Sequence, residues 1–207
     1  MKKLLFIILL AVVCKTQVYC QDIEATTSDG KKVVLKSDFT WKYADAVNKE
    51  VAVSNKTFAK SSSASTQYAT KGEKVSVWYD ANSWLKNEST DPVKAVFNHK
   101  SGEIYSMIIY ERMEMTMDAL LSAALTNAKS VSPDARFTFQ EYRIVNKTKV
   151  MCAKLEGEIQ GIKFVYYSYY YTGAQGTIQV ITYTSQNLFE EYKTEMTNFL
   201  NGLVITE

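Results

Sequence analysis

The chain of 207 residues has an ordinary globular composition, with 46% hydrophobic and 22% charged residues. Its eight glycines and two prolines amount to about 5% of the chain, against an average of roughly 12%, which excludes collagen-like and linker-dominated proteins. The 24 basic and 22 acidic side chains give a net charge of +2 without a long basic run. This charge supplies little of the electrostatic footprint that nucleic-acid binding requires.

The first 20 residues have the pattern of a secretory signal peptide. A basic start precedes an apolar run of ten residues, Leu4 to Val13. That run is too short for a membrane-spanning helix, which needs about 20 residues, and suits the apolar region of a signal peptide. Val18 and Cys20 fit the positions before the cleavage site, so we expect residues 1–20 to be removed. Lipid attachment at Cys14 and a retained membrane anchor are the alternatives.

Cleavage changes the charge and the cysteine content of the mature chain. The mature chain has 21 basic and 22 acidic side chains, a net charge of −1, because the signal contains Lys2, Lys3 and Lys15. Cys152 is then the only cysteine and cannot form an internal disulfide. We therefore expect an exported protein of the periplasm or cell surface of a Gram-negative bacterium. It would meet the membrane only through its signal or a lipid anchor, and we expect no nucleic-acid partner.

Residues 21–46 predict a small N-terminal β unit. Asp29-Gly30 lies between two short β-prone runs, which is a strong hairpin signal, and a third run follows at residues 39–44. Three short strands bury too little surface to be stable alone. Residues 47–66 are polar and end in a serine-rich stretch, and this composition predicts a flexible linker.

Residues 67–207 predict one α+β domain. The predicted order of elements is β-β-β-α-β-β-β-β-α, and hairpin loops such as Lys100-Ser101-Gly102 and Gly173-Ala-Gln-Gly176 join most of the strands. Hairpins produce antiparallel sheets. A helix with one apolar stripe can cover one face of such a sheet. We therefore expect an antiparallel β-sheet flanked by helices, an α/β/α sandwich.

The two predicted helices have apolar residues at steps of three and four. The first spans about residues 117–130 and the second about residues 188–203. The boundary residues that we expect are Thr116 and Pro133 for the first helix, and a capping box of Asn187 and Glu190 with a terminal Gly202 for the second.

The segment Lys74-Val-Ser-Val-Trp-Tyr-Asp80, followed by Asn82-Ser83-Trp84, resembles the opening of the PsbP-like superfamily. The mid-chain helix, the hairpins between Tyr142 and Thr184 and the closing LFEEYKTEMTNFLNGLVI segment are also similar to that family, over about two thirds of the chain. The family includes the extrinsic photosystem II protein and a Ran-binding nuclear import factor. The resemblance implies an antiparallel sheet with helices on both faces and a non-enzymatic binding or assembly role.

The N-terminal DGKKVVLKSDFTWKYAD segment is similar to a β element at the start of exported Bacteroidetes proteins. This resemblance implies an uncharacterised secreted protein of Bacteroidetes type. It carries no functional residue to this chain, and no ligand-contact residue of the PsbP-like superfamily matches a position here.

Catalytic and metal-binding side chains are scarce in the mature chain. His99 is the only histidine and lies beside a predicted turn, while Cys152 lies between apolar neighbours, where a free cysteine behaves as a small hydrophobe. One cysteine and one histidine are too few for a typical zinc site, and no glycine-rich phosphate loop is present. We expect no catalytic residue, no metal and no cofactor. Two carboxylate pairs, which we interpret as solvated, are Glu111 with Glu114 and Glu156 with Glu158.

Aromatic residues are abundant, with 14 Tyr, 9 Phe and 3 Trp, and eight residues from Phe164 to Tyr171 hold six of them. Strand alternation places Tyr166 and Tyr170 on one face and the other three tyrosines on the opposite face. One interpretation is that helices cover both faces. The other is an exposed recognition surface made of Trp84, Tyr167, Tyr169 and Tyr171.

The sequence favours an exported, non-catalytic binding or assembly protein of the bacterial envelope. Its partner would be a protein or a small apolar ligand whose identity the sequence leaves open. Two alternatives are a hydrolase that uses carboxylates only and a purely structural, oligomeric envelope protein.

Overall fold

The computed structural model describes residues 23–27, 32–36, 40–43, 51–70, 74–91 and 94–206. The chain divides into two compact units, residues 1–50 and 51–207. The predicted signal peptide, residues 1–20, lies outside the described residues.

The first unit contains a three-stranded antiparallel sheet. Its strands are β1 (Ile23–Thr26), β2 (Lys32–Leu35) and β3 (Trp41–Tyr43), in that order. The predicted hairpin corresponds to the antiparallel pair β1 and β2, and the Asp29-Gly30 turn lies outside the described residues.

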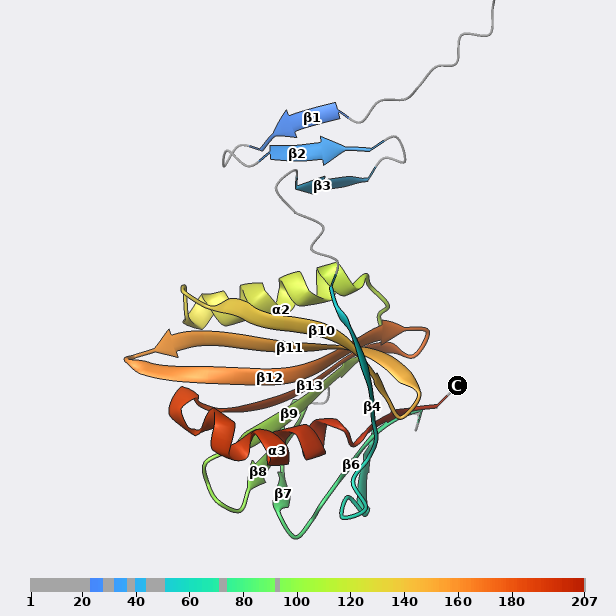
Figure 1. The fold of residues 1–207 in the computed structure, drawn as a ribbon, viewed down its shortest axis with the longest axis vertical. Helices are drawn as coiled ribbons and strands as arrows, with labels where there is room; N and C mark the ends of the chain where they lie inside the picture. The colour runs from blue at the N-terminus through green and yellow to red at the C-terminus, as the bar shows by residue number, and fades with distance from the viewer. Residues whose placement is uncertain are drawn as a thin grey trace, which may run out of the picture. The chain divides into compact units, whose positions relative to one another are not determined.

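The second unit is built on an eight-stranded sheet (Figure 1). Neighbouring strands are antiparallel, except that β4 is parallel to β10. The strands are, in sheet order, β4 (Val53–Phe58), β10 (Arg136–Val145), β11 (Thr148–Ile159), β12 (Ile162–Gly173), β13 (Gly176–Ser185), β9 (Tyr105–Glu111), β8 (Lys94–His99) and β7 (Trp84–Asn87).

A smaller antiparallel sheet and two helices complete this unit. The sheet consists of β14 (Leu203–Ile205), β6 (Val75–Tyr79) and β5 (Thr66–Ala69). The helices are α2 (Met117–Val131) and α3 (Phe189–Leu200), and the short 3-10 helix η1 (Gln186–Leu188) precedes α3. In the described part of the chain, no helix combines the length and apolar character that crossing a bilayer requires.

The ends of α2 are those that the sequence predicts, whereas the start of α3 differs. The hydroxyl of Thr116 accepts a hydrogen bond of 3.2 Å from the backbone N–H of Ala119, as an N-cap does. Asn187 instead lies inside η1, and no side chain caps α3, so the predicted capping box is wrong. The extra 3-10 turn moves the helix start to Phe189 and takes Asn187 away from the cap position.

Gly202 follows α3 because the chain there approaches β6 closely. A Cβ atom at this position would lie 1.8 Å from the carbonyl oxygen of Trp78. The backbone N–H of Trp78 in turn donates a hydrogen bond of 2.9 Å to the carbonyl of Gly202. A residue without a side chain is therefore required where the chain turns from α3 into β14.

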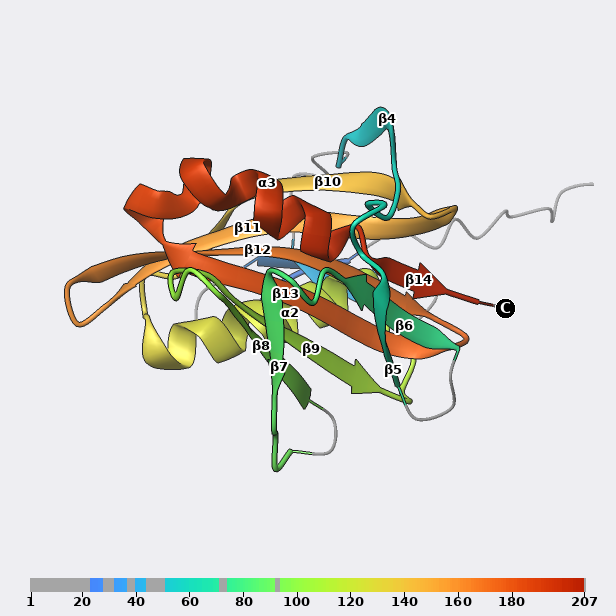
Figure 2. The ribbon, with the colours of Figure 1, turned by 90° about the horizontal axis from the view of Figure 1, so that it is seen from below.

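The two helices lie on opposite faces of the large sheet (Figure 1). On one face, α2 packs over β10, β11 and β12 around Leu120, Leu121 and Tyr170. On the other face, α3 and the small sheet lie together (Figure 2), and their residues share one core with β7 to β9 and β10 to β13. The chain is therefore α+β with a large, mostly antiparallel sheet, and the small sheet is a part of the covering layer that the sequence did not predict.

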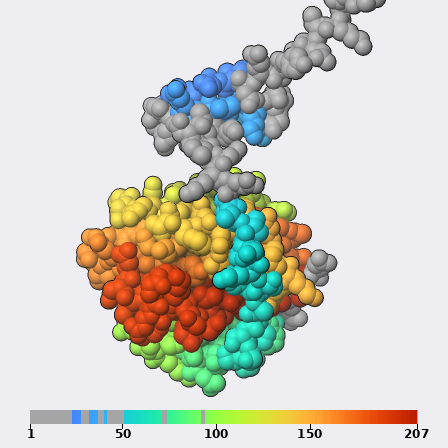
Figure 3. All heavy atoms as spheres, viewed as in Figure 1, coloured from blue at the N-terminus to red at the C-terminus, as the bar shows by residue number. Residues whose placement is uncertain are grey.

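The predicted linker at residues 47–66 is wrong from residue 51 onward. Residues 53–58 form β4 beside β10, and the atoms of this segment make a band next to α3 (Figure 3). Phe58 packs against the core and Ala64 is buried. Composition misled the prediction because an edge strand needs only backbone hydrogen bonds on one side, so polar side chains such as Asn55 and Lys56 can face solvent.

Candidate functional site

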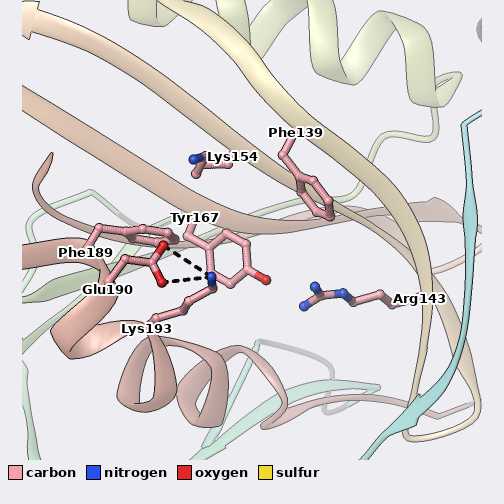
Figure 4. A pocket seen from close by; sticks show the side chains of 7 residues that line it. All are labelled: Phe139, Arg143, Lys154, Tyr167, Phe189, Glu190 and Lys193. Atoms are coloured by element: carbon pink, nitrogen blue, oxygen red, sulfur yellow. Dashed lines mark hydrogen bonds and ion pairs between the residues drawn. The ribbon is translucent and has the colours of Figure 1, made fainter.

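A hollow of about 190 Å³ lies between the start of α3 and the sheet (Figure 4). We call it the α3 pocket. Strands β10, β11 and β12 form its floor and α3 forms one wall. Its seven lining residues are Phe139 and Arg143 from β10, Lys154 from β11, Tyr167 from β12, and Phe189, Glu190 and Lys193 from α3.

Strand register assembles the floor of the α3 pocket. Phe139 is paired with Lys154 across β10 and β11, and Lys154 is paired with Tyr167 across β11 and β12. These three side chains thus form one row, because directly paired residues share a face of the sheet. A β-bulge between Phe137 and Phe139 makes the row possible, since plain alternation would put both phenylalanines on the same face. Phe137 packs with α2 instead.

The guanidinium of Arg143 lies at the inner end of the α3 pocket. Its Nε donates a hydrogen bond of 2.5 Å to Glu141, and its Nη1 donates one of 3.2 Å to the hydroxyl of Tyr169. The Tyr169 hydroxyl then donates to Oδ1 of Asn201, after α3, at 2.8 Å. The carbon at the centre of the guanidinium also lies 4.5 Å from the ring centroid of Phe58 on β4. This network joins β4, β10, β12 and α3 through one buried cation.

Burial and this network keep the polar groups in fixed protonation states near neutral pH. Burial disfavours the charged guanidinium, but its interactions with Cys152, Tyr169 and Tyr167 raise the pKa of Arg143 above its usual value. Burial raises the pKa of the Cys152 thiol to about 11 and that of Tyr169 to about 12. Burial, followed by the Cys152 interaction, also raises the pKa of Tyr167. The cation stays charged and its neighbours stay neutral.

Two lysines flank the ring of Phe189 at the mouth of the pocket. The Nζ atoms of Lys154 and Lys193 lie 5.3 and 5.4 Å from the ring centroid. Each lysine also forms an ion pair, Lys154 with Glu156 at 3.0 Å and Lys193 with Glu190 at 3.1 Å. Phe189 in turn makes an edge-to-face contact with Tyr167, with 5.6 Å between the ring centroids. Aromatic and ionic groups therefore alternate around one opening.

Two other hollows are larger, about 620 and 510 Å³. The first lies beside the turn at Asn146 and Lys147, and the second lies beside Gly161 and Ser185. Neither brings several aromatic rings and cations together, so the α3 pocket is the better candidate.

The four residues of the predicted recognition surface do not lie together on an exposed surface. Trp84 is 2% exposed and Tyr169 is fully buried, because α3 and the small sheet cover their face. Tyr167 is only 4% exposed, but it lines the α3 pocket. Tyr171 is half-buried and lines the separate hollow beside Asn146. The predicted exposed surface is therefore wrong for Trp84 and Tyr169, and of the four only Tyr167 belongs to the pocket.

The other residues that the sequence singled out lie apart from one another. Nδ1 of His99 lies 2.8 Å from the hydroxyl of Ser101 in the predicted turn, and its ring packs against Trp84. Cys152 is buried in the core. Three of the four glutamates are exposed, and the fourth, Glu156, pairs with Lys154. Within the described residues, no three His, Cys, Asp or Glu side chains are grouped so that they could hold a metal ion.

Of the seven residues that line the α3 pocket, the sequence predicts only Tyr167 as a recognition residue, because Glu190 enters the predictions only as part of a helix cap. One signal was available, because Arg143 interrupts the apolar end of β10 at a position where alternation predicts a buried side chain. The six missed residues are Phe139, Arg143, Lys154, Phe189, Glu190 and Lys193.

A family model described as "Protein of unknown function (DUF3157)" matches residues 2–152 of the chain. No curated protein matches the sequence.

Solved structures with a similar fold include cyanobacterial PsbP (CyanoP) from Synechocystis, at 11% identity and a TM-score of 0.55, covering 68% of this chain and 91% of that one. A Bacteroides thetaiotaomicron crystal structure has 10% identity and a TM-score of 0.45, covering 68% and 48%. The Ran-binding protein Mog1p from Saccharomyces cerevisiae has 5% identity and a TM-score of 0.46, covering 69% and 95%. The similarity to CyanoP confirms the predicted PsbP-like resemblance at the level of the fold.

Proposed function

The chain belongs to the DUF3157 family, and we propose that it is an exported, non-catalytic binding protein of the bacterial envelope with its ligand in the α3 pocket. The observation that carries this proposal is the convergence of three aromatic rings and three cationic groups on one hollow. Binding sites are concave and mostly apolar, with a few placed polar groups. An engineered cavity of about 150 Å³ accommodates benzene. The ligand, or the part of it that enters the α3 pocket, is therefore the size of a single ring with a small substituent.

The groups in and under the α3 pocket support a binding role over catalysis. Nucleophilic catalysis needs a nucleophile activated by a neighbouring base. The thiol of Cys152 has its pKa raised to about 11 by burial, so it is neutral near pH 7, and it is buried in the core with Tyr167 and Tyr169. The PsbP-like fold agrees with this proposal, since the resemblance implies a binding or assembly role.

The amino-terminal pattern supports export. Its basic start, short apolar run and small residue at position 20 are those of a signal peptide. Amino-terminal sequencing of the protein recovered from the periplasm should begin at Gln21. A chain that keeps Met1 in the cytoplasm would contradict the export part of the proposal and leave the binding part intact.

Nuclear magnetic resonance titration tests the binding part. The purified chain, processed as the cell leaves it, is titrated with benzyl alcohol, benzamide and benzoate. We expect saturable shifts of the amides at Tyr167, Phe189 and Lys193 with at least one compound. Phe139→Trp should weaken binding at least tenfold. The Phe139 side chain is partly exposed at the pocket mouth, and the larger indole ring would fill the space there.

Val131→Trp is the matched control for that variant. It adds the same ring to an exposed position at the end of α2, on the opposite face of the sheet, and should leave binding unchanged. The absence of saturable binding by all three compounds would contradict the proposal. Equal weakening by both tryptophan variants would move the site away from the α3 pocket.

A further inference from the structure

We propose that the α3 pocket binds a small organic anion that consists of one flat apolar ring and one carboxylate. The ring packs against Phe189 and Tyr167, and the carboxylate pairs with Lys193, with Arg143 as the second cation at the inner end of the pocket. This inference rests on the proposed function, because it assigns a ligand class to the same pocket.

The aromatic part of the lining selects a flat ring. Tyr167 and Phe189 already meet edge to face, with 5.6 Å between their ring centroids, and Phe139 closes the row from β10. Such edge-to-face and offset contacts are the preferred geometry of aromatic pairs, so a third ring extends the same arrangement. A volume of about 190 Å³ holds one ring and a small head group.

The inner end of the pocket supplies hydrogen-bond donors for an anion. An arginine guanidinium carries five N–H donors. Glu141 and Tyr169 take one each, and the described residues provide no hydrogen-bond acceptor for the other three. Figure 4 shows the guanidinium of Arg143 pointing from β10 toward the hydroxyl end of Tyr167. Because Arg143 is buried, water screens its charge little, and an oxyanion that reaches it gains a strong charge-assisted hydrogen bond.

The outer end of the pocket contains an exchangeable ion pair. Glu190 and Lys193 occupy neighbouring turns of α3, and their side chains are 76% and 47% exposed. An ion pair this exposed contributes little to stability, so a ligand carboxylate can replace that of Glu190. The pair of Lys154 and Glu156 is more buried, at 26% and 15% exposed, and remains paired. Glu190 is thus a built-in competitor for the ligand.

The charge balance of the pocket favours a single negative charge. Three cations face it, and each has an acidic partner: Arg143 with Glu141, Lys154 with Glu156, and Lys193 with Glu190. Only the last pair is exposed enough to exchange readily. One carboxylate replaces the charge of Glu190, whereas a doubly charged phosphate would require a second exchange from a more buried pair. The ligand is therefore a carboxylate rather than a phosphate monoester.

Benzoate and benzamide are the probes that test this assignment, because they have the same shape and differ in charge. Isothermal titration of the purified chain at pH 7 and low ionic strength should show benzoate binding about tenfold more tightly than benzamide. Lys193→Met should lower benzoate affinity about tenfold, and Glu190→Gln should raise it several-fold because the competing carboxylate is gone. Neither substitution should change benzamide affinity. Lys129→Met, at an exposed position on α2, is the control and should change neither.

The outcomes separate this inference from the proposed function. Equal binding of benzoate and benzamide at the α3 pocket would overturn the anion assignment and leave the binding function standing. Tighter binding of phenyl phosphate than of benzoate would overturn the argument for a single charge. Binding of neither ring compound would remove both proposals. Because Glu190 and Lys193 are exposed, both variants should keep the thermal unfolding midpoint of the unmodified chain. Opposite changes in benzoate affinity could then not result from a loss of folding.

Discussion

The two faces of the eight-stranded sheet both carry aromatic side chains, but they hold them in different environments. On the face toward α3, Phe97 and Tyr169 are almost completely buried, and so is Phe199 of the covering helix. On the face toward α2, Tyr183 on β13 and Tyr105 on β9 are half-buried, and their rings stack with 5.3 Å between centroids. The same residue type therefore forms a sealed core on one side and a partly open layer on the other.

The difference lies in what covers each face. On one side, α3 and the small sheet together reach from β10 to β7, so that a single core spans the whole width. On the other side, α2 packs over β10, β11 and β12. Strand alternation decides which face a tyrosine occupies, but the length of the cover decides whether it is buried. The α3 pocket lies at one end of the fuller cover, where α3 begins.

The largest expected effect comes from removing a ring on the α3 side. Phe199 is 2% exposed, and its ring lies 4.5 Å from that of Trp84 and 5.2 Å from that of Phe97, between centroids. Phe199→Ala should lower the free energy of unfolding by about 3–5 kcal/mol, because the cavity left in a sealed core cannot refill. Urea unfolding followed by circular dichroism measures this change.

Tyr183→Ala is the matched truncation on the α2 side. It should cost only about 1 kcal/mol, since the half-buried ring already meets solvent. If Phe199→Ala and Tyr183→Ala lost similar free energies of unfolding, the two faces would be equally well covered. That result would contradict the difference described above.

Removing a single hydroxyl should have a smaller effect, again on the α3 side. The hydroxyl of Tyr169 accepts from Arg143 and donates to Asn201, so Tyr169→Phe leaves two buried polar groups without this partner. We expect a loss of about 1–3 kcal/mol in the free energy of unfolding. Tyr183→Phe should be nearly neutral. A neutral Tyr169→Phe would mean that the network does not fasten α3 to the sheet.

Local patterns gave the elements that depend on neighbouring residues. Thr116 caps α2, the chain between Gly173 and Gly176 forms a hairpin, and the tyrosines of β12 alternate between the two faces as predicted. Each of these features is decided within a few residues of chain, where capping, turn chemistry and the period of two act directly.

The α3 pocket could not be predicted in this way. Phe139, Lys154, Tyr167 and Phe189 come from four elements and meet only after the register is fixed. The bulge before Phe139 also reverses the face that alternation assigns to that residue. Trp84 is covered by α3, and only the folded chain brings its ring to 4.5 Å from that of Phe199, between centroids.

The last prediction uses the buried thiol of Cys152 as a reporter of the sealed face. Burial raises its pKa from 9.0 to about 11 in the folded chain, so the folded state holds the proton more tightly than the unfolded state does. The stability from this group is complete below pH 9 and is lost as the pH rises from 9 to 11. Between pH 7 and 10 the loss should be about 1.4 kcal/mol. Urea unfolding at each pH, under reducing conditions, measures this loss.

The control is Cys152→Ala, which should remove the loss of stability between pH 9 and 10. It should keep the loss that begins above pH 10, where Tyr169 and Tyr170 start to contribute because burial raises their pKa values to about 12. Identical slopes in the two proteins would mean that solvent reaches Cys152 in the folded state, and that the cover over this face is no tighter than the cover over the other.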